Sequence, residues 1–211
     1  MMLGRRAAIV AGIATLGSAA WGRPPTGLWF DPTQLPSFSG RLARWLINPA
    51  GELDRALFRE GAQVIFPPSE AQALTAAIAD GASLTVWGIR ARTAPVIIML
   101  AWSREGATPQ FVERPSWFAS TARGTERLTL TGKIAAPLLT PQGDPMGVIL
   151  EDGAVIRLAT EWMNAEPARF ANGREIAAQG LGTRNGARAA LDAERLGEKA
   201  DAMQDVPESY R

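Results

Sequence analysis

The chain has 211 residues, of which 46% are apolar and 20% charged, and its formal net charge is +1. These values suit a soluble globular protein with one or two domains better than a disordered or fibrous chain. The near-zero charge gives no general attraction to nucleic acid or anionic lipid. The sequence contains no histidine and no cysteine, which excludes the commonest general base, thiol nucleophiles, disulfides and nearly every structural zinc site. We therefore expect no metal ion and no cofactor.

Residues 1–22 have the features of an export signal. Arg5 and Arg6 are followed by an apolar stretch over residues 7–20 and then by small residues suited to a signal peptidase. The stretch is shorter than the roughly 20 residues that span a membrane, so the mature chain should carry no transmembrane segment. The signal predicts a periplasmic or secreted protein. The arginine pair leaves both the general secretory route and the twin-arginine route open.

Residues 23–38 form a proline-rich lead-in that contains Leu28, Trp29 and Phe30. We expect this extended segment to place an apolar patch on the module that follows.

The same module occurs twice after the lead-in. Residues 39–88 align with residues 131–180 without a gap, at a constant offset of 92 (131 − 39). The glycines Gly40, Gly51, Gly61, Gly81 and Gly88 recur as Gly132, Gly143, Gly153, Gly173 and Gly180. The shared residues are turn and core positions, which specify a fold and carry no catalytic constellation.

The first copy predicts three strands, a helix and two more strands. Strands are expected over residues 40–47, 53–58 and 63–66, separated by a type I turn at 48–51 and a hairpin turn at 60–61. A capping box of Ser69 and Gln72 predicts a helix that ends at a left-handed Gly81. The last strands should cover residues 82–92 and 95–102, with a bulge or bend at Gly88. In the second copy, Pro167 should shorten or kink the helix.

This order of elements is that of an OB-fold, the small Greek-key barrel. With that assignment the chain resembles a recurring bacterial pattern of exported OB-fold-like domains over residues 28–196. The resemblance implies an all-β fold with short helices: two tandem OB-fold-like five-stranded Greek-key barrels, each with a helix between strands 3 and 4. It implies no catalytic residue set. We expect barrels at residues 39–102 and 131–196, and a polar tail, disordered or frayed, at 197–211. The connector, residues 103–130, should pack along the barrels through Phe111, Trp117 and Phe118.

The strand 2 and 3 face of an OB-fold and its adjoining loops form a groove for oligonucleotides or oligosaccharides. Seven residues of the first copy fall on or near these elements and are our predicted ligand-binding residues: Arg41, Arg44, Trp45, Arg55, Arg59, Trp87 and Arg90. For the two tryptophans, packing in the core or at a barrel end is the competing interpretation and the favoured one. Neither copy carries enough net positive charge for a basic groove.

The sequence therefore favours a non-enzymatic binding or scaffolding protein of the bacterial cell envelope. The partner would be an envelope protein, a glycan or a small ligand, and at most one copy should bind it, because the loop residues differ between copies. The alternative is a single-stranded nucleic-acid-binding protein, which combines aromatic and cationic groups. A third hypothesis is a hydrolase that uses Glu52 and Asp54, which would share one strand face.

Overall fold

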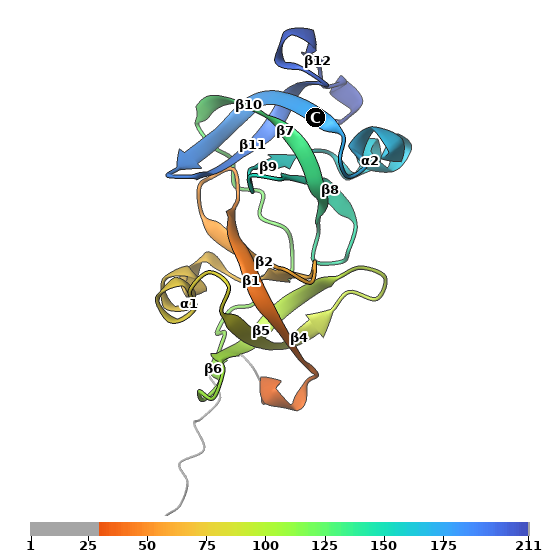
Figure 1. Ribbon diagram of the computed structural model, residues 1–211. Helices are drawn as coiled ribbons and strands as arrows, with labels where there is room; N and C mark the ends of the chain where they lie inside the picture. The colour runs from red at the N-terminus through yellow and green to blue at the C-terminus, as the bar shows by residue number, and fades with distance from the viewer. Residues whose placement is uncertain (1–29, 211) are drawn as a thin grey trace, which may run out of the picture.

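The computed structural model describes residues 30–210, which form an all-β protein with short helices (Figure 1). The predicted export signal, Leu28 and Trp29 lie outside the described residues. Of the lead-in, the structure describes a 3-10 turn at Pro32–Gln34, where the Asp31 carboxylate accepts a hydrogen bond from the Thr33 backbone N–H (2.9 Å). None of the helices within residues 30–210 is long and apolar enough to cross a membrane.

The first sheet closes into a five-stranded barrel. Its strands are β1 (Ser37–Ile47), β2 (Leu53–Phe58), β3 (Gln63–Ile65), β4 (Ser83–Arg90) and β5 (Val96–Arg104). β1 pairs with β2 and β4, β2 with β3, and β4 with β5, all antiparallel. The parallel pairing of β3 with β5 closes the ring. A short strand, β6 (Gln110–Phe111), adds to the outer edge of β5.

The second sheet has the same order of pairings. Its strands are β7 (Glu126–Leu139), β8 (Pro145–Leu150), β9 (Val155–Arg157), β10 (Glu175–Asn185), β11 (Arg188–Gly197) and β12 (Gln204–Asp205). β7 pairs with β8 and β10, β8 with β9, β10 with β11, and β9 runs parallel to β11. β2, β3, β4 and β5 begin 92 residues before β8, β9, β10 and β11, respectively.

Glycines set the turns and the bends between these strands. Gly51 and Gly143 have φ of 88° and 101°, and each backbone N–H closes a turn on the carbonyl three residues earlier. Only glycine adopts such angles without strain. At Gly88 the register between β4 and β5 shifts, and a Cβ there would lie 1.9 Å from the carbonyl oxygen of Ile98. The predicted bulge is therefore confirmed, and it brings two backbones into close contact.

The helix of the first module does not begin as predicted. Pro68–Glu70 forms a 3-10 turn, and α1 (Ala71–Ala77) follows it with no side-chain cap, so the capping-box prediction is wrong. Pro68 fixes its own φ and starts the tight turn. Gly81 is left-handed (φ 78°), but it lies in the turn before β4 and not at the helix end. In the second module α2 (Thr160–Ala165) ends before Pro167, which opens a 3-10 turn. The helix has 6 residues against 7 in α1, so the predicted shortening is confirmed.

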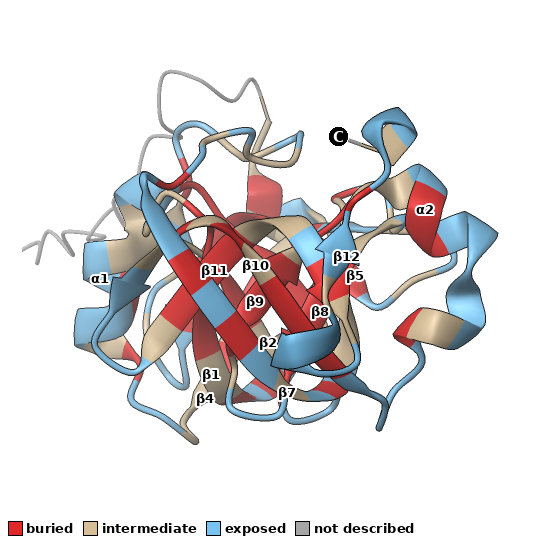
Figure 2. Ribbon diagram, turned by 90° about the horizontal axis from the view of Figure 1, so that it is seen from above, coloured by how far each residue is buried: buried red, intermediate tan, exposed pale blue. Residues whose placement is uncertain are grey.

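Each barrel encloses its own apolar core, and buried residues lie along the strands in Figure 2. In the first barrel, Trp45 packs edge-to-face on Phe66 with ring centroids 5.8 Å apart. In the second, Trp162 on α2 contacts Phe170 in the same way. Trp45 therefore belongs to the core, in agreement with the favoured interpretation of this residue.

Residues 204–210 of the C-terminal tail pack on the second barrel, which corrects the prediction of a frayed terminus. β12 pairs with β11, and the Val206 side chain is buried in the core of the second barrel. Tyr210 stacks on Trp162 with centroids 5.7 Å apart and an interplanar angle of 4°. The tail was predicted to be frayed because its composition is polar. Val206 and Tyr210 nevertheless hold it by burial against the barrel.

The connector lies along both barrels, but two of its predicted anchors are exposed. Val112 is fully buried in the first core, and its backbone N–H donates to the Leu100 carbonyl (2.9 Å). Trp117 and Phe118 are exposed instead. These two aromatic side chains are therefore available at the surface, and the segment is held by other contacts.

Candidate functional site

The two barrels meet through equivalent positions. Leu46 and Leu138, which are 92 residues apart, both belong to the apolar cluster between the barrels. A Cβ on Gly51 would lie 2.7 Å from the Thr183 side chain, and a Cβ on Gly143 would lie 3.3 Å from Ala91. These two contacts join the same pair of positions with the modules exchanged, which is the signature of a two-fold axis. α1 and α2 accordingly lie on opposite sides of the molecule (Figure 1).

A buried arginine joins the first barrel to the second. Arg55 donates to the Gln63 side-chain oxygen (2.6 Å) and to the Leu139 carbonyl (2.7 Å). Gln63 in turn donates to the Pro137 carbonyl (2.7 Å) and accepts from the Leu139 N–H (3.2 Å). Burial lowers the pKa of Arg55 to about 10, so the guanidinium remains charged at neutral pH. These contacts make Arg55 an interdomain clamp.

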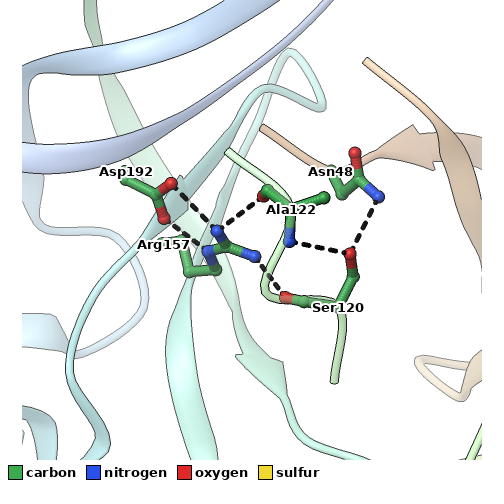
Figure 3. Close-up of polar contacts among 5 residues, drawn as sticks. All are labelled: Asn48, Ser120, Ala122, Arg157 and Asp192. Carbon is green, nitrogen blue, oxygen red and sulfur yellow. Dashed lines mark hydrogen bonds and ion pairs between the residues drawn. The ribbon is translucent and has the colours of Figure 1, made fainter. Parts of the chain in front are cut away.

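A second arginine holds the connector against the second barrel (Figure 3). Arg157, on β9, forms a bidentate ion pair with Asp192 on β11, with Nη2 2.9 Å from Oδ2. It also donates to the carbonyls of Ser120 and, at 2.9 Å, Ala122. The Ser120 hydroxyl accepts a hydrogen bond from Asn48 of the first barrel (3.4 Å). Both barrels therefore grip the same stretch of connector.

The sequence did not single out Arg157. Position 157 aligns with Ile65, an apolar strand residue of the first copy. An arginine at such a position could have marked Arg157 as a residue with a special role.

A cavity of about 300 Å³ lies between the barrels at one end of the first. Its apolar walls come from Ile47, Phe66, Leu138, Met146 and Val155, and its polar walls from Asn48, Glu52, Asp54, Arg55, Ser120 and Arg157. Phe118 of the connector, whose exposed fraction is 80%, also lines the cavity. Both barrels and the connector contribute, so this cavity exists only when the modules are docked.

Two carboxylates of the first barrel line this cavity. Asn48 fixes Glu52, because its Nδ2 donates to Oε2 (3.0 Å) and its Oδ1 accepts from the Glu52 N–H (3.1 Å). Burial raises the pKa of Asp54, against the lowering effects of Arg55 and of a hydrogen bond from Asn48. Asp54 forms no ion pair with any described residue. The sequence paired these two acids for hydrolysis, and the structure brings both to one cavity.

The predicted ligand-binding residues do not form one groove. Arg41 and Arg59 are neighbours, since the Arg59 N–H donates to the Arg41 carbonyl (2.8 Å). Arg41 pairs across the sheet with Ser83 at one end of β4, and Arg90 lies at the other end. Seven residue steps at about 3.3 Å each separate these ends by about 23 Å.

The other predicted residues have individual surroundings. Arg44 lies against Gly153 of the second barrel, where an added Cβ would be 2.6 Å from its guanidinium. Trp87 is half-buried on β4 between β1 and β5. Trp45 is in the core and Arg55 in the clamp, so neither presents a free surface. Only Arg55 of the seven lines the cavity.

A second hollow of about 780 Å³ lies at the equivalent end of the second barrel. Thr140, Met146 and Leu158 line it at positions that correspond to Asn48, Asp54 and Phe66. Methionine at position 146 gives this hollow no counterpart of the Asp54 carboxylate. Tyr210 of the tail also lines it.

Within residues 30–210, no group of three or more acidic side chains is placed to hold a metal ion. No family model and no curated protein matches the chain. Among solved structures, a crystal structure of a deletion mutant of the single-stranded DNA-binding protein from Thermus aquaticus is similar at 17% sequence identity and a TM-score of 0.23. That match covers 82% of this chain and 95% of that chain. A TM-score of this size carries no argument about function.

Proposed function

We propose that this protein is a non-enzymatic binding protein of the bacterial cell envelope, built from two tandem OB-fold-like Greek-key barrels that hold a small ligand between them. The observation that carries the proposal is the cavity of about 300 Å³ formed jointly by both barrels and the connector. Small-molecule sites favour such positions between domains, with apolar walls and a few polar groups. The tandem arrangement is supported by the matching strand order and the reciprocal contacts of the two sheets.

The test is affinity capture of small molecules from envelope extracts by the immobilised protein. Phe118→Ala removes an exposed aromatic side chain that lines the cavity, and Trp117→Ala removes a neighbouring exposed one that does not line it. We expect the Trp117 variant to retain the wild-type ligand and the Phe118 variant to lose it. Equal retention by both variants would place the site elsewhere.

Export rests on residues 1–22 and is tested separately. Fractionation of cells that express the full chain should place the protein in the periplasm or the medium. Replacement of Arg5 and Arg6 by lysine should block export only if the twin-arginine route is used. A wholly cytoplasmic chain that keeps its first 22 residues would contradict the envelope role.

One observation favours the nucleic-acid alternative. All six ion pairs within the described residues involve cations of the second half of the chain, from Arg127 to Arg195. On the first barrel, Arg41, Arg59 and Arg90 are exposed and form no ion pair with a described residue. Such cations are available to phosphates. Binding of oligonucleotides that weakens steeply with added salt, and that is lost in an Arg41→Ala/Arg59→Ala variant, would support this alternative.

A further inference from the structure

We infer that the cavity between the barrels selects a small organic cation, an amine with an apolar body, whose ammonium group pairs with Asp54 and whose apolar part lies beneath Phe118. This inference rests on the proposed function and names the ligand class of the same site.

The charges around the cavity leave one negative charge uncompensated. Arg55 is directed to Gln63 and the Leu139 carbonyl, and Arg157 to Asp192 and the connector carbonyls. The charged side chains that line the cavity, Glu52, Asp54, Arg55 and Arg157, sum to zero. Asp192 does not line the cavity, but it pairs with Arg157 and brings the group to −1. One monovalent cation neutralises the site, whereas an anionic ligand would double the imbalance.

Asp54 is the carboxylate that gains most from such a ligand. Asn48 donates to both carboxylates, but Glu52 is exposed to solvent, while Asp54 is half-buried and forms no ion pair with a described residue. An ionised carboxylate that is removed from water without a cationic partner is unfavourable. An ammonium group supplies both the opposite charge and a charge-assisted hydrogen bond.

The remaining walls suit an apolar body. Ile47, Phe66 and Val155 are buried and line the cavity, and Phe118 extends from the connector. An exposed phenylalanine at the rim of a cavity is suited to cover an apolar ligand or to contact a cation with its ring face. The volume is at the small end of ligand pockets, which favours a body of one ring or a short chain.

The second barrel supports a single site per chain. Met146 occupies the position of Asp54, and Thr140 that of Asn48. Four acids line the equivalent hollow, but three of them, Asp192, Glu194 and Asp205, already form ion pairs with arginines. We therefore expect one amine to bind per chain.

Calorimetry on the purified full-length protein tests the inference with three probes of similar shape: 2-phenylethylamine, 2-phenylethanol and 3-phenylpropanoate. We expect the amine to bind with a stoichiometry of one and more tightly than the other two. Asp54→Asn should weaken the amine about ten- to a hundredfold, the value of one charge-assisted hydrogen bond. The matched control is Asp80→Asn, which removes an exposed acid and installs the residue that the second copy has at position 172. It should bind the amine as wild type does.

The pH dependence gives an independent readout. Amine affinity should rise with pH through the titration of Asp54 and lose this dependence in Asp54→Asn. The other charged groups that face Asp54 are Glu52, Arg55 and Arg157, and Glu52→Gln should leave the dependence in place.

Three results would overturn the inferred ligand class. They are equal amine binding by wild type and Asp54→Asn, preferential binding of 3-phenylpropanoate, and no binding of the amine. None of these decides the proposed function, because capture from envelope extracts with the Phe118 and Trp117 variants measures occupancy of the cavity by any ligand. Loss of a captured ligand in Phe118→Ala, together with a failed amine titration, would keep the site and reject the ammonium class.

Discussion

Arg157 should be one of the most costly polar side chains to remove. Its side chain is only 13% exposed and forms a bidentate ion pair with Asp192, whose side chain is 26% exposed. Arg157→Ala would leave this carboxylate and the carbonyls of Ser120 and Ala122 without their donor. Removing one partner of a buried ion pair costs about 3–5 kcal/mol. Because Asp192 retains some contact with water, we expect the lower end, about 3 kcal/mol.

Urea unfolding measures this loss, and Arg127→Ala is the matched control. Arg127 also pairs with a carboxylate of the second barrel, Glu194, at 2.8 Å, but the two side chains are 58% and 38% exposed. An exposed pair contributes about 0.2–1 kcal/mol. Trypsin cleavage after Arg123 reports on the connector, and it should become faster in Arg157→Ala and stay unchanged in Arg127→Ala. Equal free energies of unfolding for the two variants would refute the role that we assign to Arg157.

Three further substitutions test separate features. Burial raises the pKa of Asp54, so the stability of the wild-type protein falls as pH rises from 3.8, the ordinary pKa of this group, through its folded-state pKa. At pH 7 Asp54→Asn should therefore unfold at higher urea concentration than wild type. Below pH 3.8 this difference should vanish. Arg55→Met should lower the free energy of unfolding in urea by about 1–3 kcal/mol, because the buried Leu139 carbonyl loses its donor. Gly88→Ala places a Cβ 1.9 Å from the Ile98 carbonyl oxygen, and the forced backbone shift should cost about 2–3 kcal/mol in thermal unfolding.

The strand order was predictable because the geometry of a turn depends on the residues of the turn itself. Gly51 and Gly61 occupy left-handed positions at the ends of strands that the sequence already delimited, and the glycines 92 residues later do the same. The bulge at Gly88 was predictable for a similar reason, since a glycine inside an apolar strand usually marks a bulge or a close approach of two backbones. Because the same turn residues occur in both copies, each copy supported the strand boundaries predicted for the other.

The errors came from residues whose role depends on distant partners. Ser69 and Gln72 match a capping box, but Pro68 imposes a 3-10 turn on the same segment. The tail looks polar, and its two anchors, Val206 and Tyr210, gain their role only from the second barrel. Local pattern cannot report such contacts, because their energy comes from burial against elements remote in sequence.

The candidate site was the least predictable part, because it is formed by docking. Of the residues expected to bind ligand, Arg55 alone lines the cavity, and its buried contacts assign it to the interface. Arg157 and Asp54 acquire their significance from the approach of the second barrel and the connector. A single copy of the module, taken by itself, contains neither the cavity nor its charge balance.

The asymmetry between the copies follows from this docking. Position 147, equivalent to Arg55, is a glycine with φ of 152°, and a Cβ there would lie 2.3 Å from the Ile156 carbonyl oxygen. The second copy therefore cannot carry an arginine clamp of its own, and only the first can supply the buried cation that crosses the interface. The two barrels are related by a two-fold axis, but only the first contributes an arginine clamp to the interface. The two hollows are therefore unequal, and Met146 in the second copy takes the place of Asp54. This asymmetry agrees with the single ligand per chain that we propose.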